Sequence, residues 1–281
     1  MTDWLAYDFA RRALIAGVLV ALMCAVLAFF VVLRRMAFVG AGISHAALGG
    51  VAIGLVAGVS PIVTAMGFSI VVAWAIGWIS ERGQITEETT IGILFPTTMA
   101  FGIAVISLSA TYRQDLMAYL FGSMLAVRRA DLWLLFVLAG GTLTVLTLFF
   151  KELVYLSIDP DAARAAKVPV TALRYLLLSV LAATIVASIK LVGVVLVSAL
   201  LVIPAATGQL AARSMTGMLV TSIVSALIAV ILGLWLSWVS NLPSGATIVL
   251  LTSGLFFVAF MTRRLRRGSS RFGRAAPSRK G

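Results

Sequence analysis

One imidazole lies in an otherwise apolar stretch of the chain, residues 34–54. His45 is the only histidine, and Ala41 and Gly49 lie one helical turn on either side of it. A polar group inside a bundle of apolar helices is costly unless it has a partner or lines a wet path. Because the neighbouring side chains are small, His45 could face a pathway wide enough for an ion. The alternative is a hydrogen-bonded histidine that serves packing alone, and the residues leave both open.

Small residues recur at every fourth position around this histidine. In a helix this spacing places them on one face, and a bare face lets the backbone of another helix approach closely. We therefore expect a helix-packing stripe at Gly42, Ala46, Gly50, Gly54 and Gly58.

A second unusual segment is SIDPDAARAAKVPV, residues 157–170. Asp159 or Ser157 can cap a short helix, and Pro160 suits its first turn. Acidic residues precede basic ones, as the helix dipole favours, and Pro169 ends the helix before the next apolar run. We predict a short amphipathic helix that could dock a partner and transmit movement, since the membrane holds both of its ends; a structured loop is the alternative. The residues of this helix that we expect to matter are Asp159, Pro160, Asp161, Ala163, Arg164 and Lys167.

Two prolines fall inside predicted membrane helices. Proline has no backbone N–H, so Pro204 leaves the carbonyl of Leu200 without its usual partner, and Pro96 does the same to Gly92. We expect a kink at each proline, which helix bundles tolerate and transporters often contain.

The sequence offers no recognisable catalytic machinery. It has no Gly-x-x-x-x-Gly-Lys-Ser/Thr loop, no His-Glu-x-x-His and a single cysteine, Cys24. Carboxylates are nearly missing from the apolar runs, although Glu81, Glu87 and Glu88 cluster at one predicted cytoplasmic loop. A carrier driven by protons or sodium usually has acidic residues at mid-membrane. We therefore predict that the chain is not an enzyme and that its energy source lies on another subunit.

The composition identifies the elements that must hold these residues. Hydrophobic residues make up 62% and charged residues 11% of the 281 residues, with a mean hydropathy of +1.11, whereas soluble domains carry about 25% charged residues. Repeated apolar runs predict an all-α, polytopic membrane bundle with about eight or nine spans. The piece at 116–125 is too short to span and could be an interfacial or re-entrant helix. The predicted spans are 13–33, 42–58, 61–80, 90–110, 132–150, 172–189, 191–212, 218–240 and 246–261.

The positive charge of the chain indicates its orientation. The formal net charge is +12, and cytoplasmic loops of membrane proteins accumulate Lys and Arg. Most of these cations lie on one side if the loop after the first span is cytoplasmic, so we expect a cytoplasmic C-terminus and no nucleic-acid binding. Residues 1–262 are predicted to form the transmembrane domain. Residues 263–281 are predicted to be a disordered basic tail that anionic lipid attracts.

Six motifs in order resemble the permease subunit of the zinc/manganese-type family of ABC transporters. The stretch Gly40–Val51 follows an arginine-ended first span and resembles the family's Gly-Asp-Ala-x-Ser-His-Ala-x-Leu-Pro-Gly-Val motif. The similarity covers almost the whole chain. The other motifs are EETTIGILF (87–95), YLFGSMLAV (119–127), SIDPDAARAAKVPV (157–170), GVVLVSALLVIPAATGQL (193–210) and LPSGATIVL (242–250).

This resemblance implies a permease like those of type II ABC importers, with zinc or manganese as the transported ion rather than a cofactor. Two copies of the chain would form the pathway in a bacterial inner membrane. Two ATP-hydrolysing subunits would dock at a coupling helix over 159–168, and an extracytoplasmic metal-binding protein would deliver the ion.

Two positions depart from the family motif. The Asp that lies four residues before the histidine is Ala41 here, and Gly49 replaces a proline. In the family that Asp and the histidine are thought to form a transient metal site, so His45 must find other ligands, pass the metal weakly, or do neither. The missing carboxylate keeps open a related permease for a chelated metal or another substrate. A stand-alone secondary carrier and a membrane enzyme are more distant alternatives.

Overall fold

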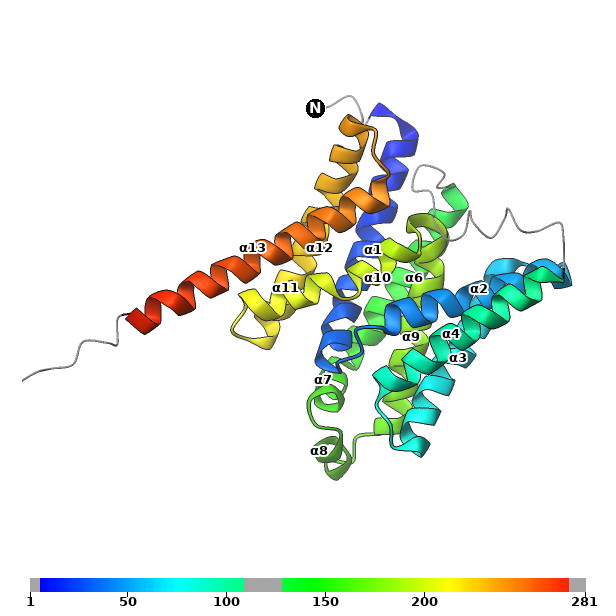
Figure 1. The fold of residues 1–281 in the computed structure, drawn as a ribbon, viewed down its shortest axis with the longest axis horizontal. Helices are drawn as coiled ribbons and strands as arrows, with labels where there is room; N and C mark the ends of the chain where they lie inside the picture. Colours follow the sequence, from blue (N-terminus) through cyan, green and yellow to red (C-terminus); the bar gives the residue numbers. More distant parts are fainter. Residues whose placement is uncertain (1–5, 109–127, 273–281) are drawn as a thin grey trace, which may run out of the picture.

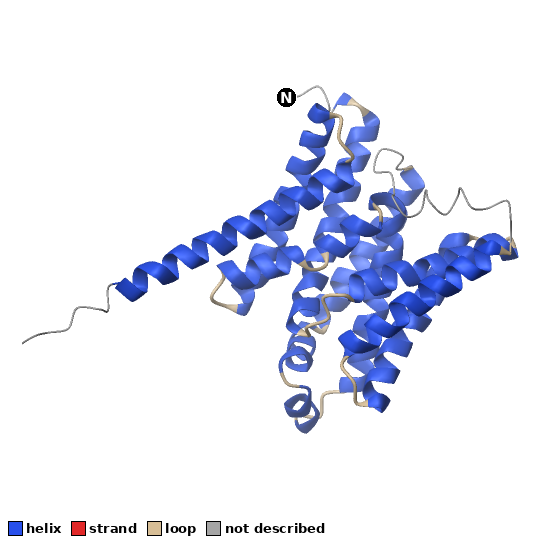
Figure 2. Cartoon of the chain, viewed as in Figure 1, coloured by secondary structure: helices blue, strands red, loops and turns tan. Residues whose placement is uncertain are grey.

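The computed structural model describes residues 6–108 and 128–272, with side chains up to residue 265, and every regular element among these residues is an α-helix (Figure 2). Within them, nine helical segments are long and apolar enough to cross a membrane, if residues 194–211 are counted as one segment, and this confirms the predicted all-α bundle. The piece at 116–125 and the motif at 119–127 lie outside the described residues. The long helices are α1 (Asp8–Leu33), α2 (Val39–Ala57), α3 (Pro61–Gly83), α4 (Glu87–Ser107), α6 (Arg129–Leu148), α9 (Val170–Val192), α12 (Met215–Ser240) and α13 (Ser244–Phe272), and the short ones are α7 (Phe150–Ile158), α8 (Pro160–Ala165), α10 (Val194–Leu200) and α11 (Ile203–Ala211).

Both ends of the helical domain extend beyond the predicted apolar spans. Helix α1 begins at Asp8, before the arginine pair, and the carboxylate of Asp8 lies in its first turn, where the helix dipole is positive. Helix α13 continues to Phe272. The predicted boundary at residue 262 therefore falls inside a helix, and the first part of the predicted disordered tail is helical.

The predicted span at 191–212 is not one kinked helix but two short helices. Gly193 separates α9 from α10 with φ of 81°, a conformation that a residue with a Cβ rarely adopts. Pro204 lies in the first turn of α11. The prolyl ring fits there because the first N–H groups of a helix have no partner within it, so Pro204 starts a helix instead of bending one. Pro96, by contrast, lies inside the continuous helix α4.

The helices form two groups on either side of α9 (Figure 1). Helices α2, α3 and α4 pack against one another in one group, and α1, α11, α12 and α13 form the other. Helix α9 contacts α1, α2, α3 and α6. The short helices α7 and α8 project at the lower end of Figure 1, the end at which the turn between α3 and α4 also lies.

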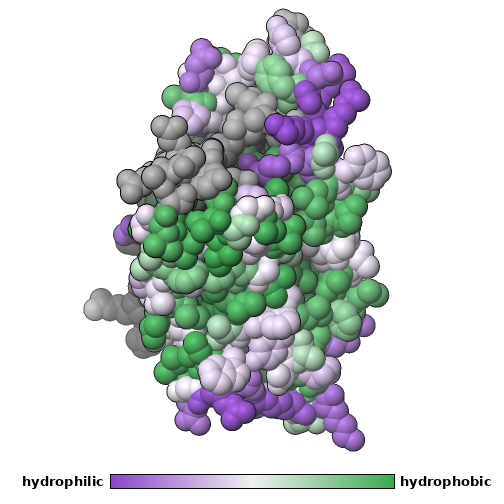
Figure 3. All heavy atoms as spheres, turned by 90° about the vertical axis from the view of Figure 1, so that its right-hand side faces the viewer, coloured by the Kyte–Doolittle hydropathy of each residue, from purple (hydrophilic) through white to green (hydrophobic). Residues whose placement is uncertain are grey.

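Apolar packing holds the bundle together, and its outer surface is apolar as well. Phe29 and Phe30 of α1 lie against Phe150 of α7, with ring centroids 5.9 and 5.7 Å from it. One buried polar contact joins α12 to α1, since Ser222 Oγ donates a hydrogen bond of 3.0 Å to the carbonyl of Ala25. Figure 3 shows a hydrophobic band between hydrophilic ends, as expected of helices that face lipid.

Candidate functional site

Helix α2 carries His45 and is enclosed by α3, α4, α9 and α10. The predicted glycine stripe on α2 meets two helices. A Cβ added to Gly42 would lie 2.7 Å from Cγ2 of Ile91 in α4, and one added to Gly50 would lie 2.5 Å from Cα of Ala65 in α3. These contacts fit the packing function expected of the stripe, because only a hydrogen at each position leaves room for the neighbouring helix.

The rest of the stripe divides between packing and chain reversal. Ala46 is fully buried, and Gly54 lies against the start of α3. Gly58 does not pack: it ends α2 in the left-handed region with φ of 68°. The backbones of α2 and α4 also approach closely at Gly49, since a Cβ on Gly102 would lie 3.0 Å from the Cα of Gly49.

His45 is half-buried on α2 and points toward α4. Its Nδ1 lies 2.8 Å from the carbonyl oxygen of Ala41. A carbonyl only accepts, so this contact places the proton on Nδ1 and leaves the lone pair of the neutral ring on Nε2. The imidazole also meets the ring of Phe95 edge-on, with centroids 4.7 Å apart. The imidazole is thus oriented by the backbone carbonyl of Ala41, the residue that stands where the family motif has an Asp.

The described residues contain no ready-made metal centre. Among them, no group of three or more His, Cys, Asp and Glu side chains could hold a metal ion. A transport pathway needs sites from which the ion can leave again. Within the described part of the chain, His45 Nε2 is therefore a single ligand nitrogen and not a member of a group of three or more such ligands.

Helix α8 forms where the sequence predicted it. The carboxylate of Asp159 accepts 3.0 Å hydrogen bonds from the backbone N–H groups of Asp161 and Ala162, so Asp159, and not Ser157, is the cap. Ser157 instead donates to the carbonyl of Leu153. Pro160 occupies the first turn. The helix is thus capped by its own side chain, as its sequence predicted.

One buried residue anchors α8 to the bundle, while the charged side chains of this helix point outward. Ala163 is fully buried, whereas Asp161 and Arg164 are exposed and form an ion pair of 3.2 Å. Lys167 lies just past the helix end, with φ of 61°. The N–H of Val168 then bonds the carbonyl of Ala163 at 3.0 Å, which fixes the turn into α9. The outward face of α8 is therefore polar and available to a partner.

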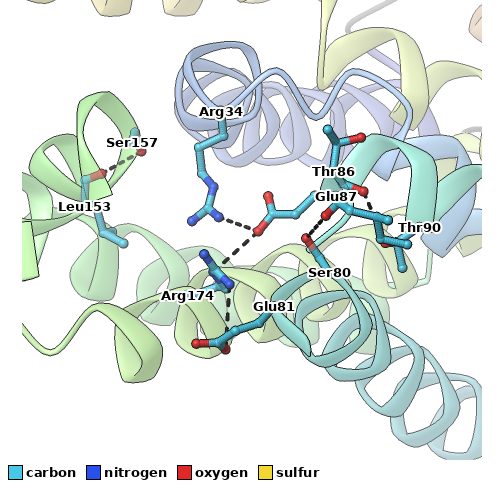
Figure 4. A network of polar contacts seen from close by, with 10 residues as sticks. Arg34, Ser80, Glu81, Thr86, Glu87, Thr90, Leu153, Ser157 and Arg174 are labelled. Atoms are coloured by element: carbon cyan, nitrogen blue, oxygen red, sulfur yellow. Dashed lines mark hydrogen bonds and ion pairs between the residues drawn. The ribbon is translucent and has the colours of Figure 1, made fainter. Parts of the chain in front are cut away.

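Near α8, four charged side chains from four helix ends form an ionic cluster, which we define as Arg34, Glu81, Glu87 and Arg174 (Figure 4); all but Glu81 are largely buried. Glu87 Oε1 lies 2.5 Å from Nη2 of Arg34 and 3.5 Å from Nε of Arg174. Arg174 also lies 3.7 Å from Glu81. Only 8% of the Arg34 side chain and 12% of the Glu87 side chain is exposed. The ends of α1, α4 and α9 thus meet at the Glu87 carboxylate, and the end of α3 joins them through the pair of Glu81 with Arg174.

Burial perturbs the ionisation of one member of this cluster, Arg34. Removal from water lowers the pKa of the Arg34 guanidinium from its ordinary value, and the charge of Glu87 offsets part of that shift. From the sequence, Glu81 and Glu87 were acids of a loop, Arg34 followed the first span, and Arg174 lay at the start of the predicted span 172–189. Their pairing could not be deduced, because it depends on how α1, α4 and α9 pack.

A cavity of about 470 Å³ separates the ionic cluster from α8. Arg34, Arg35 and Glu87 line one side, and Ser157, Ile158 and Pro160 line the other. The ionic cluster and the predicted docking helix therefore border the same space at one end of the bundle.

A separate ion pair lies at the opposite end of α9. Lys190 Nζ is 2.6 Å from Oδ1 of Asp131 at the start of α6. The other carboxylate oxygen of Asp131 accepts a 3.2 Å hydrogen bond from the N–H of Arg128. The carboxylate of Asp131 thus caps α6 and also holds α6 to α9 through Lys190. The sequence did not reveal this double role.

Comparison with known proteins places this arrangement in a family. Residues 6–263 match the family described as the ABC 3 transport family. The manganese transport system membrane protein MntC of Listeria monocytogenes is 37% identical over 255 residues, covering 91% of each chain. The high-affinity zinc uptake system membrane protein ZnuB of Haemophilus influenzae is 32% identical, covering 92% of this chain and 98% of its own.

A solved structure has the same fold. PsaBC from Streptococcus pneumoniae, in complex with Fab, superposes with a TM-score of 0.80 at 32% identity, covering 91% of this chain and 92% of that one. The match of the family over nearly all described helices, the two transport-system relatives and the shared fold agree with one another. The chain therefore belongs to the ABC 3 transport family and is a permease of the metal ABC transporter type.

Proposed function

We propose that this chain is the membrane subunit of an ATP-driven importer for a divalent metal ion, with zinc or manganese as cargo. Two copies would form the pathway in a bacterial inner membrane, with the C-terminus in the cytoplasm and the basic tail near anionic lipid. The names of the relatives, which refer to manganese and zinc systems, support the class of substrate.

Helix α8 is the observation that carries this proposal. A short, side-chain-capped helix with a buried anchor at Ala163 and an exposed polar face lies between two membrane segments. Such a helix suits docking to a separate ATP-hydrolysing subunit, because movement of α8 would be passed directly to α7 and α9. The Lys and Arg bias of the loops supports a cytoplasmic position for this end, where ATP is available.

His45 is the proposed point of contact with the ion. Nitrogen is a good ligand atom for zinc and for other divalent transition metals, and Nε2 is left free by the bond between Nδ1 and Ala41. One neutral nitrogen binds weakly, which allows the ion to leave. Further ligands would come from the metal's water or from the second copy, and an extracytoplasmic metal-binding protein would deliver the ion from outside.

A second candidate follows from the missing carboxylate at position 41. A pathway that lacks this negative charge is less favourable for a bare divalent cation and suits a chelated metal or another substrate better. The fold and the motor would be the same, and only the cargo would differ.

One assay on the purified complex tests both candidates. The chain is reconstituted with its ATP-hydrolysing subunit, and ATP hydrolysis is measured with Mn²⁺, with Zn²⁺ and with each metal bound to citrate. We expect stimulation by a free divalent ion that is lost on Asp159→Ala and kept on Asp161→Ala, which leaves the cap intact. Stimulation by the citrate complexes alone would favour the second candidate. An ATPase that does not bind the chain would overturn both.

A further inference from the structure

The ionic cluster is placed to connect the docking helix with the histidine of the pathway. Glu87, Ile91 and Phe95 are four residues apart on α4, so they share one face of that helix. Along this face, Glu87 binds Arg34 and Arg174, Ile91 fills the space over Gly42, and Phe95 meets His45. Glu87 therefore lies on the same face of α4 that packs against α2.

The link from α8 to this face passes through α9. The turn between α8 and α9 is held by backbone hydrogen bonds from Val168 to Ala163 and from Val170 to Val168, of 3.0 and 2.8 Å. Arg174 follows in the first turns of α9 and reaches Glu87. Helix α8 contacts α7 and α9, while α4 packs chiefly on α2 and α3. A movement of α8 would thus reach α4 through Arg174 and Glu87.

The contact between α3 and α9 has support besides Glu81. A Cβ on Gly77 would lie 3.0 Å from Leu178, and Trp74 Nε1 donates a 2.8 Å hydrogen bond to Ser179. These contacts hold α3 on α9 even without the Glu81 pair. Glu87, in contrast, has an arginine from each side and little exposure, so it is the acid whose loss would release α4.

Stability alone is a weak reason for such a cluster. Replacing a buried ion pair by apolar residues is often neutral or stabilising, whereas buried charges in several proteins fix one arrangement among alternatives. We propose that Glu87 is a positioning residue: held by Arg34 and Arg174, it fixes the face of α4 that meets His45 and couples that face to α8. This rests on the proposed function for the identity of the motor, but the positioning itself is a property of the chain alone.

The first test therefore needs no partner. Spin labels at Ala162 in α8 and Glu88 in α4, both exposed, are introduced as cysteines in a Cys24→Ala background of the full chain in lipid nanodiscs. We expect one narrow distance distribution, which is lost on Glu87→Gln and kept on Glu81→Gln. The double variant Arg34→Gln/Glu87→Gln removes one charge of each sign, so it guards against misfolding caused by an unpaired buried arginine. A narrow distribution in both Glu87 variants would overturn the proposal.

The second test uses the complex with the ATP-hydrolysing subunit. We expect Glu87→Gln to lower the ratio of metal-stimulated to basal ATP hydrolysis by about fivefold or more, the lower range of coupling between distant sites. Basal hydrolysis and assembly should match the wild type, and Glu88→Gln should behave as the wild type. A merely structural role would lower both rates together, which would contradict the proposal. If the wild type itself shows no stimulation, the proposed function fails, and the distance measurement alone decides whether Glu87 positions α4.

Discussion

Replacing Gly50 by alanine tests whether α2 needs a bare face against α3. A Cβ at this position would lie 2.5 Å from Cα of Ala65 and 2.7 Å from the carbonyl oxygen of Thr64. Both are backbone atoms, so no side-chain rotation can relieve the overlap. One of the two helices would have to shift.

Two opposing effects set the size of the change. Alanine within a helix is more stable than glycine by about 0.5–1 kcal/mol, whereas overpacking a filled interior costs about 1–3 kcal/mol. At the middle of each range, overpacking exceeds the helix preference by about 1 kcal/mol, which is the net destabilisation expected. The matched control is Gly67→Ala in α3, where an added Cβ would have no atom within 4 Å, so only the stabilising effect of about 0.5–1 kcal/mol is expected there.

Thermal unfolding of the purified chain in one detergent measures the difference. At about 2–4 °C per kcal/mol, Gly50→Ala should lower the unfolding temperature by roughly 2–4 °C and Gly67→Ala should raise it by roughly 1–4 °C. The same scan rate is used throughout, since irreversible unfolding makes the midpoint depend on it. If Gly50→Ala unfolds at or above the wild-type temperature while the control behaves as expected, the close packing of α2 on α3 is refuted.

Three further changes test the cap, the histidine and a buried hydrogen bond. Asp159→Ala removes two bonds to the backbone of α8 and should lower retention of the ATP-hydrolysing subunit on a pull-down column, with a helix cost of about 0.5–2 kcal/mol. His45→Ala should raise the metal concentration for half-maximal uptake by about tenfold or more, the least that loss of a supporting partner costs; unchanged uptake would remove His45 from the pathway. Ser222→Ala should lower the unfolding free energy by about 0.5–1.5 kcal/mol, and an unchanged value would show that its bond to Ala25 is not formed.

The spans were predictable because each depends on local composition. A run of about 20 apolar residues crosses a bilayer whatever it packs against. The same holds for α8, since Asp159 and Pro160 act on backbone groups within their own turn. The break between α10 and α11 was missed, because an apolar run has the same hydropathy whether or not the helix continues through it.

The arrangement around the site depends on contacts that the sequence does not encode locally. The spacing of Gly42 and Gly50 indicated a bare face, but it could not show that α4 covers one and α3 the other. Likewise, the pairing of Arg34 with Glu87 joins residues more than fifty positions apart. The loss of the family carboxylate was visible at Ala41, whereas the use of the Ala41 carbonyl to orient His45 required the helix itself.

Metal uptake into sealed proteoliposomes tests whether transport by this chain depends on ATP hydrolysis by a separate subunit. Vesicles containing the chain with its ATP-hydrolysing subunit are loaded with fluorescent metal indicator, and the metal-binding protein and Mn²⁺ or Zn²⁺ are added on the side that faces away from the motor. We expect metal to accumulate only when ATP is hydrolysed, and we expect Asp159→Ala but not Asp161→Ala to slow this accumulation. Accumulation at an equal rate without ATP, or with the chain alone, would show a carrier that needs no motor and would contradict the account.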